Sequence, residues 1–339
     1  MRVLVTGHDG YIGCVMVPML VAKGHEVVGL DNGLFEGCEF DQPPVSETIR
    51  ADVRDVTREQ LEGFDAVIHL AGISNDPLGD LNPQCTYDIN HLASVRIAEQ
   101  AKAAGVPRFL HSSSCSLYGA AGNDYIDESG EFNPVTPYGE SKVLVEQDVS
   151  KMASDDFHPT YMRNATAYGL SSRLRGDLVV NNLTGYAMTK GEVFLKSDGT
   201  PWRPLVHIRD ISKAFIAVLH ADVDKIHNVA FNVGSTEENY RISEVGEIVA
   251  DVVPDSRITM AESAGPDLRN YRVNCDFLVE TLPDAAPDWT VRKGVEELYE
   301  AYKAHGLTLE EFESSRYLRI KHVHGLQETG KLDNDLRWT

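Results

Sequence analysis

The sequence contains few cysteines and no long hydrophobic run. Its five cysteines are odd in number and none are in CxxC spacing, which argues against a disulfide framework or a structural zinc site and favours a reducing compartment. No stretch of about 18 apolar residues occurs, so no membrane-spanning helix is expected. The first residues, MRVLVTG, do not have the apolar stretch or cleavage site of a signal peptide. We therefore expect a cytoplasmic protein that binds neither a metal ion nor a membrane.

Positive charge is also scarce. The chain has 31 Lys and Arg against 52 Asp and Glu, a formal net charge of −21. A field of this sign repels a phosphate backbone, so nucleic-acid binding is not expected, and any phosphate site needs a few local arginines and backbone amides. Hydrophobic residues make up 42% and charged residues 24%, which excludes disorder, a collagen-like repeat or a coiled coil as the main structure.

Short apolar runs alternate with longer amphipathic runs in the first half of the chain. Strands are expected at Arg2–Val5, Glu26–Leu30, Ala66–Leu70, Arg108–His111 and Thr160–Arg163. Helices are expected at Tyr11–Lys23, Pro83–Ala104, Pro137–Met152, Asp210–His220 and Val291–His305. Strands separated by helices predict an α/β fold, a Rossmann-type doubly wound parallel sheet. The rhythm breaks after Gly169, so a smaller, mixed C-terminal region that binds the substrate should follow.

A glycine-rich segment, TGHDGYIG, joins the first strand to the first helix at Thr6–Gly13. Its glycines, Gly7, Gly10 and Gly13, allow a tight turn, a close approach of the backbone to a pyrophosphate, and close packing of helix on strand. The helix N-terminus then offers free N–H groups to the phosphates. Its place between a strand and a helix predicts a dinucleotide-binding loop.

The second strand ends at Asp31-Asn32, about 20 residues beyond the loop. A carboxylate there can accept hydrogen bonds from both ribose hydroxyls of NAD and repels the 2′-phosphate of NADP. No Arg or Lys follows within residues 32–35, so NAD is the expected cofactor. Asp52-Val53 precede the next predicted strand and are placed to meet the adenine edge.

Tyr138 and Lys142 lie four residues apart on a predicted helix and so share one face. A nearby ammonium favours the phenolate, which suits a general base acting on a hydroxyl. The serine-rich run Ser112–Gly119 leaves a strand, where a serine hydroxyl can reach the same point. Hydroxyl, phenol and amine together predict a proton-transfer site beside the dinucleotide loop.

In order and spacing, these segments resemble the extended short-chain dehydrogenase/reductase family, the NAD-dependent nucleotide-sugar epimerases and dehydratases. The resemblance extends from Arg2 to about His305. It rests on Thr6–Gly13, Asp31, His69–Gly72, Asn90, Ser112–Gly119, Tyr138–Lys142, Arg163–Gly169 and Arg203–Asp210. It implies an enzyme whose substrate is a nucleotide-diphosphate sugar. It also implies that residues 1–169, with 203–232 returning to them, bind NAD, and that 170–202 and 233–339 bind the nucleotide sugar.

The resemblance also assigns roles to single residues. Ser114, Tyr138 and Lys142 are the expected catalytic residues. The expected cofactor-binding residues are Gly7, Gly10, Tyr11, Ile12, Gly13, Asp31, Asn32, Asp52, Val53, Leu70, Ala71, Gly72, Asn90, Tyr138, Lys142 and Tyr168. The expected substrate-binding residues are Ser74, Ser114, Ser116, Thr166, Arg175, Asn182, Arg203 and Arg269. Arg272 is an alternative to Arg269, and Arg173 and Asn181 are further candidates for lining the pocket.

Cys115 and Ser116 stand where the 4,6-dehydratase branch carries an Asp-Glu pair, which argues against an ordinary 4,6-dehydratase. The 3,5-epimerase branch has a cysteine two residues after the catalytic serine, whereas here it is one residue after. Cys115 is therefore either a catalytic acid or base or a packing thiol. Thr166 replaces an Asn that contacts the sugar diphosphate in many relatives.

We therefore expect an epimerase that works through a 4-keto sugar, with inversion at C4 the leading interpretation. A dehydratase or 3,5-epimerase that uses Cys115, or a ketoreductase, are the alternatives. A non-catalytic dinucleotide-binding protein is disfavoured because the three catalytic residues are intact. The helices at Pro83–Ala104 and Pro137–Met152 resemble the pair that builds a homodimer interface in this family, so a homodimer is expected.

Overall fold

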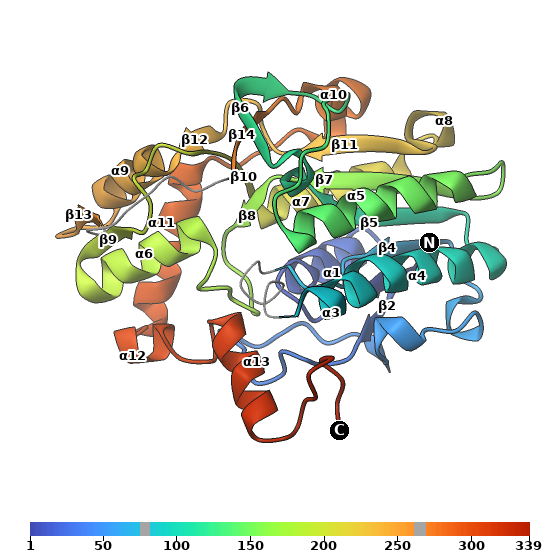
Figure 1. Cartoon of the computed structure of the whole chain (residues 1–339), viewed down its shortest axis with the longest axis horizontal. Coiled ribbons are helices and arrows are strands. Elements are labelled where there is room, and N and C mark those ends of the chain that lie inside the picture. Colours follow the sequence, from blue (N-terminus) through green and yellow to red (C-terminus); the bar gives the residue numbers. More distant parts are fainter. Residues whose placement is uncertain (75–81, 261–268) are drawn as a thin grey trace.

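A computed structural model of the chain describes residues 1–74, 82–260 and 269–339 (Figure 1). Its main sheet has seven strands in the spatial order β11-β7-β5-β4-β1-β2-β3, and every neighbouring pair is parallel. The strands are β1 (Arg2–Thr6), β2 (Glu26–Asp31), β3 (Glu47–Arg50), β4 (Ala66–His69), β5 (Arg108–Ser114), β7 (His158–Asn164) and β11 (Val229–Val233). This sheet confirms the predicted Rossmann-type α/β fold.

The strand order reverses at β1. The chain first builds outward through β2 and β3, and it then returns to the other side of β1 to add β4, β5, β7 and β11. In open α/β sheets, ligands bind at such a reversal, in the crevice outside the carboxyl ends of the strands. The glycine-rich loop after β1 and residues Leu70–Gly72 after β4 both lie at this edge.

Helices cover both faces of the main sheet (Figure 1). The covering helices are α1 (Gly13–Ala22), α7 (Ile208–His220), α4 (Ala93–Ala103) and α5 (Pro137–Val149). Successive strand residues point to opposite faces. Val3 and Val5 therefore pack in one core with α1 and α7, while Leu4 packs in another with α4 and α5. Four of the five expected helices thus form the two outer layers.

One of these layers contains an irregular turn. Helix α3 (Pro83–Tyr87) continues into a π-helical turn at Asp88–Leu92 and then into α4. The chain is helical from Pro83 to Ala103, close to the predicted range, but the widened turn carries Asn90, which is 1% exposed. Such π turns occur often at functional sites.

A smaller region of mixed sheets is built mostly from residues that follow β7, with β6 contributed from before it. It contains a three-stranded sheet, a β13-β9 pair and a β14-β6 pair. The strands are β6 (Ala120–Ile126), β8 (Thr166–Tyr168), β9 (Glu192–Leu195), β10 (Trp202–His207), β12 (Asn239–Arg241), β13 (Arg257–Met260) and β14 (Asn270–Val273). Helices α6 (Val179–Lys190), α9 (Ile242–Val252) and α11 (Val291–His305) share its apolar core. The region agrees with the predicted smaller unit, although β10 pairs with β8 and β12 rather than with the main sheet.

The remaining helices are short: α8 (Val223–Ile226), α10 (Asp276–Thr281), α12 (Leu309–Phe312) and α13 (Arg319–Glu328). His322, Val323 and His324 lie inside α13. Across the three described ranges, no helix has both the length and the apolar character needed to cross a membrane.

Candidate cofactor and substrate site

The loop between β1 and α1 is packed too closely for side chains at its glycines. Gly7 has a φ of +70°, and a Cβ added there would lie 2.8 Å from the Ala71 Cα atom. A Cβ at Gly13 would lie 2.3 Å from the His8 carbonyl oxygen, and one at Gly10 would lie 3.0 Å from the Gly7 oxygen. The bare backbone, followed at once by the start of α1, therefore fits a pyrophosphate cradle.

Tyr11 links this loop to the smaller region. Its hydroxyl donates a hydrogen bond to the Gly169 carbonyl at 2.7 Å and accepts one from Asn181 Nδ2 at 3.1 Å. Burial raises the pKa of Tyr11. The ring is turned into the protein, as is the neighbouring Ile12 against the main core. The side chains of Tyr11 and Ile12 therefore point away from the expected cofactor site, and only their main-chain atoms are placed to contact a cofactor.

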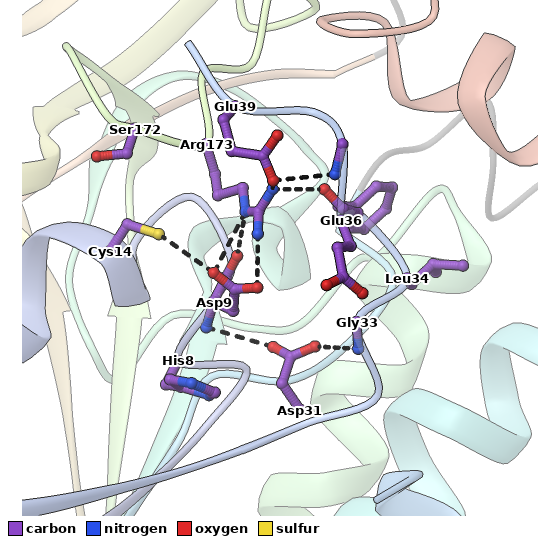
Figure 2. Close-up of polar contacts among 12 residues, drawn as sticks. His8, Asp9, Cys14, Asp31, Gly33, Leu34, Glu36, Glu39, Ser172 and Arg173 are labelled. Carbon is purple, nitrogen blue, oxygen red and sulfur yellow. Dashed lines mark hydrogen bonds and ion pairs between the residues drawn. The ribbon is translucent and has the colours of Figure 1, made fainter. Parts of the chain in front are cut away.

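The Asp31 carboxylate stands at the end of β2, next to the glycine-rich loop (Figure 2). It accepts hydrogen bonds from the Gly33 nitrogen at 2.8 Å and from the Asp9 nitrogen at 3.3 Å. Burial raises the pKa of Asp31. The adjacent Asn32 side chain accepts from the Leu34 nitrogen at 3.0 Å, so it shapes the turn after the strand.

Arg173 joins the loop to the segment after β2 (Figure 2). Its guanidinium, 2% exposed, contacts the Asp9 carboxylate at 2.6 Å, the Phe35 carbonyl at 2.8 Å and the Glu39 carboxylate. Arg173 was expected only as a pocket-lining candidate. With all these acceptors engaged, it acts as a positioning residue for the glycine-rich loop.

A second arginine, Arg50, lies near Asp31 in the fold, although it does not follow Asp31 closely in sequence. Arg50 is the partner of Asp31 in the β2–β3 register, and its guanidinium lies over Gly33. It forms a 2.5 Å ion pair with Glu36. The Arg50 guanidinium is therefore a cation at the end of β2, where the ribose of the cofactor is expected to bind, but its charge is paired with Glu36.

Asp52 and Val53 begin a short 3-10 turn, η1 (Val53–Asp55). The Asp52 carboxylate accepts from the Arg54 nitrogen at 2.9 Å and from the Arg54 guanidinium at 2.9 and 2.6 Å. Burial raises the pKa of Asp52, but the hydrogen bonds from Arg54 outweigh this effect, so the pKa lies below its usual value. The structure thus fixes this carboxylate through Arg54, a residue that the motifs do not single out.

Asn90 shapes the loop after β4. Its Oδ1 accepts from the Ile73 nitrogen at 2.7 Å, and its Nδ2 donates to the Ile73 carbonyl at 2.9 Å. A Cβ at Gly72 would lie 2.9 Å from Asn90 Oδ1. Asn90 therefore holds Leu70–Gly72 in place, and its amide is occupied by the protein itself.

Helix α5 carries Tyr138 and Lys142, the pair that the sequence predicts to transfer protons. It begins at the Thr136 N-cap, which accepts from the Gly139 nitrogen at 3.2 Å, and this places Tyr138 in the first turn. The buried Lys142 ammonium donates to the Ser112 carbonyl at 2.7 Å and lies 5.6 Å from the Tyr138 ring centroid. Burial lowers the pKa of Lys142 to about 8, against the opposing field of Glu146.

The end of β5 faces this helix closely. A Cβ at Gly139 would lie 2.9 Å from the Ser116 carbonyl oxygen, so only glycine permits the approach. Ser114 ends β5, and its hydroxyl donates to Ser116 Oγ at 2.9 Å and accepts from the Ser116 nitrogen at 3.1 Å. The structure thus gathers the serine hydroxyls beside the helix that carries Tyr138 and Lys142.

Cys115 is fully buried in a small core with Leu117, Tyr118 and Val273. Its thiol donates to the Arg163 carbonyl at 3.0 Å, and burial raises its pKa. Both features place the thiol in a packing environment. All five cysteines of the chain are free and buried.

Two arginines expected to grip a diphosphate lie together. Arg203, in β10, is 5% exposed and donates to the Trp202 carbonyl at 2.8 Å and to the Arg269 carbonyl. Residues 266–268 of the Arg269 segment lie outside the described residues. The alternative, Arg272, instead stacks on the Tyr125 ring at 3.9 Å from its centroid.

Arg175 is a further cationic side chain among the expected substrate-binding residues. Arg175 donates to Ser74 Oγ at 3.0 Å and pairs with Asp177 at 2.8 Å. Burial opposes its charge, but Asp177 and the fields of Tyr11 and Tyr138 raise the pKa of Arg175.

Three expected site residues have mainly structural surroundings. Asn182 Nδ2 donates to the Gly176 carbonyl at 2.6 Å. Thr166 is half-buried in β8 opposite Leu205. The Tyr168 ring is fully buried against His207, with 5.3 Å between ring centroids, so its side chain does not face an open site.

Comparison with known proteins agrees with this geometry. The model of the NAD dependent epimerase/dehydratase family matches residues 3–234. The chain belongs to this family. It is therefore an enzyme, its cofactor is NAD, and the resemblance found in the sequence is confirmed. The glycine cradle and Asp31 fit that cofactor.

Relatives and solved structures extend the comparison. A UDP-glucose 4-epimerase of Corynebacterium glutamicum is 28% identical over 74% of this chain and 80% of its own length. A UDP-glucose 4-epimerase of Neisseria meningitidis serogroup C is 28% identical over 88% and 95%. The solved structure of MoeE5 with UDP-glucose and NAD matches with a TM-score of 0.75 and 25% identity over 90% of this chain and 99% of its own. An NDP-hexosamine 5,6-dehydratase, TunA, shares the fold with a TM-score of 0.79 at 23% identity, over 89% and 98%.

Among the described residues, no three His, Cys, Asp or Glu side chains are grouped as a metal ion would require.

Proposed function

We propose that this enzyme inverts C4 of a nucleotide-diphosphate sugar through a 4-keto intermediate. One observation carries the proposal: Tyr138 and Lys142 share a face of α5, and Lys142 touches the end of β5 that carries Ser114, beside the glycine-rich loop. The names of the curated relatives, UDP-glucose 4-epimerases, support the same reaction. NAD, when bound, supplies the acceptor and donor of the C4 hydride.

Tyr138 is assigned as the general base and acid. Its phenolate oxygen takes the proton of the C4 hydroxyl as the C4 carbonyl forms, and it returns that proton when the carbonyl is reduced on its other face. The Ser114 hydroxyl donates a hydrogen bond to the same substrate oxygen. The Lys142 ammonium stabilises the phenolate and holds the nicotinamide ribose.

The cofactor half is assigned to the glycine loop, Asp31-Asn32, Asp52-Val53 and Leu70–Gly72. Main-chain N–H groups at the start of α1 meet the pyrophosphate, and the Asp31 carboxylate accepts from the ribose hydroxyls. Asn90 and the Tyr11 side chain act by positioning. We also propose that residues 1–169 with 203–232 hold NAD, as the sequence predicts.

The substrate half is assigned to three arginines and four smaller side chains. Arg203, Arg269 and Arg175 supply the local positive charge that a diphosphate needs in a chain with a net charge of −21. The residues assigned to the sugar are Ser74, Ser116, Thr166 and Asn182.

The alternatives through Cys115, a dehydratase or a 3,5-epimerase, receive no support from the position of its thiol. Its hydrogen bond to the Arg163 carbonyl supports the packing interpretation instead. A ketoreductase differs in consuming its cofactor, because it releases the cofactor in the other redox state.

Incubation of the enzyme with a panel of UDP- and other nucleotide sugars tests the proposal. We expect interconversion of a C4 epimer pair with only enzyme-bound NAD and no build-up of NADH. Tyr138→Phe should bind NAD as the wild type does and lose at least about 100-fold in kcat. A product formed in proportion to added cofactor, or full activity of Tyr138→Phe, would contradict the proposal.

A further inference from the structure

The chain after α11 returns to the cofactor half of the molecule. Figure 1 shows α13 and the segment that follows it, in red, below the end of β2 and away from α6 and α9. Residues 331–339 fold as a compact turn, in which Leu332 bridges Trp338 and the Asp333 nitrogen donates to the Arg337 carbonyl at 2.9 Å. Sequence reasoning assigns this segment to substrate binding, but its contacts lie elsewhere.

The 331–339 turn contacts both segments expected to hold adenosine. The Trp338 indole N–H donates to the Asn32 carbonyl at 2.9 Å, directly after Asp31. Arg337 forms an ion pair with Asp55 at 2.5 Å, within η1. The turn therefore bridges the ends of β2 and of the β3–η1 segment from outside.

Arg54 connects the turn to the adenine side. The same guanidinium that pairs with Asp52 donates to the Asp335 carbonyl at 2.6 Å and to the Leu336 carbonyl at 3.2 Å. The Arg54 side chain is only 9% exposed, so these charge-assisted bonds are largely shielded from water. The orientation of the Asp52 carboxylate thus depends on the turn being in place.

Apolar contacts also stabilise the 331–339 turn. Leu332 and Leu336 are 3% and 4% exposed and pack with Ile73, Cys85 and Val323. Leu336 has a φ of +57°, which a side chain larger than glycine adopts only when its surroundings impose it. The turn is therefore held in one conformation.

The 331–339 turn also contacts a third element, the start of α3. Asn82 Nδ2 donates to the Asn334 carbonyl at 3.0 Å, and the Cys85 thiol donates to the Asp335 carbonyl at 3.3 Å, both at the start of α3. From α13, His322 Nε2 donates to the Leu34 carbonyl at 2.8 Å. The turn and α13 therefore span the segments that follow β2 and β3 and the start of α3.

We propose that residues 331–339 are part of the NAD site: they form the outer wall of its adenosine half and retain the cofactor between turnovers. The inference rests on the proposed function, because an epimerase regenerates NAD in place and gains nothing from releasing it.

The release rate of NAD tests the inference. Protein loaded with radiolabelled NAD is mixed with excess unlabelled NAD, and the label retained on a filter is followed with time. The variant Trp338→Phe/Arg337→Ala removes the indole N–H donor and the ion pair with Asp55. The control Arg292→Ala removes a comparable exposed ion pair, with Asp251 at 2.7 Å, far from the turn. We expect release at least roughly tenfold faster in the double variant and unchanged in the control.

Protease protection of the wild-type protein gives a second readout. If the turn slows the release of NAD, then bound NAD must stabilise the folded turn, because the coupling between the two is reciprocal. Saturating NAD should therefore slow tryptic cleavage after Lys331 and Arg337, as measured by mass spectrometry. Equal release rates in variant and wild type, or cleavage indifferent to NAD, would overturn the inference while leaving the proposed function intact. A wild-type protein that binds no NAD would overturn both.

Discussion

Arg173 and Asp9 form a largely buried ion pair, with 2.6 Å between Nη2 and Oδ2, that joins the glycine-rich loop to the segment following β8. The same guanidinium reaches the Glu39 carboxylate and the Phe35 carbonyl. One side chain therefore sets the distance between the pyrophosphate cradle, the end of β2 and the start of the smaller region (Figure 2).

Arg173→Met should weaken both folding and NAD binding. The Asp9 and Glu39 carboxylates, 22% and 27% exposed, would lose their counter-charge but keep some water. We expect the free energy of unfolding to fall by about 2–3 kcal/mol, below the cost for a fully buried pair. Urea denaturation and NAD titration measure the two effects. Arg292→Met, which breaks an exposed pair, should change neither, and equal effects of the two variants would contradict the role assigned to Arg173.

The pKa of Lys142 predicts the pH above which activity falls. Its pKa is lowered to about 8 by burial, so the ammonium that stabilises the Tyr138 phenolate is lost as the pH rises through that value. We expect kcat/KM to decline above about pH 8. Lys142→Arg, which stays charged to much higher pH, should keep residual activity with the alkaline decline moved upward. A pH profile that is flat to about pH 9.5 in the wild type would contradict this assignment.

Cys115 should matter to stability and not to rate. Cys115→Ala removes a buried thiol and leaves a small cavity, which we expect to lower the free energy of unfolding by about 1–2 kcal/mol. The kcat at saturating substrate should stay within about threefold of the wild type. A fall of roughly 100-fold, about 2.7 kcal/mol of barrier, with unchanged melting would instead indicate a catalytic thiol and chemistry at a carbon next to C4.

The helices α4 and α5 predict a homodimer. They lie side by side on one face of the main sheet, and Leu92, in the π turn before α4, is 55% exposed. Leu92→Asp should convert a dimer into a monomer in sedimentation experiments at micromolar concentration. Val45→Asp alters a residue that is 92% exposed in a loop and should leave the dimer intact. A wild-type mass of one chain would contradict the prediction.

The sequence predicts the features that depend on local patterns. The apolar runs of β1, β2, β4, β5 and β7, the glycine loop and the Tyr138–Lys142 spacing are all visible in one short window. Strand β3 is missed because its residues, Glu47–Arg50, are mostly exposed and polar. Strand β11 is missed because only the second half of it is buried.

Long-range partners account for the rest. Arg50 reaches the turn after Asp31 from a neighbouring strand, and Arg173 reaches the glycine loop from 164 residues away. The contacts of Trp338 and Arg337 join residues 306 and 282 positions apart. No spacing in the sequence marks such pairs, because the fold alone brings them together. Cys115 shows the same limit, because the burial of its thiol and the hydrogen bond to the Arg163 carbonyl, which favour the packing interpretation, are visible only in the structure.

NMR of the product formed in deuterated water tests the central claim most directly. The enzyme is incubated with the nucleotide sugar that it converts, and deuterium is measured at each ring carbon. Because the hydride taken from C4 is returned to C4 and no C–H bond at C3 or C5 is broken, inversion at C4 predicts a C4 epimer with no deuterium at C3, C4 or C5. Deuterium at C3 or C5, or loss of a hydroxyl from the sugar, would contradict C4 inversion.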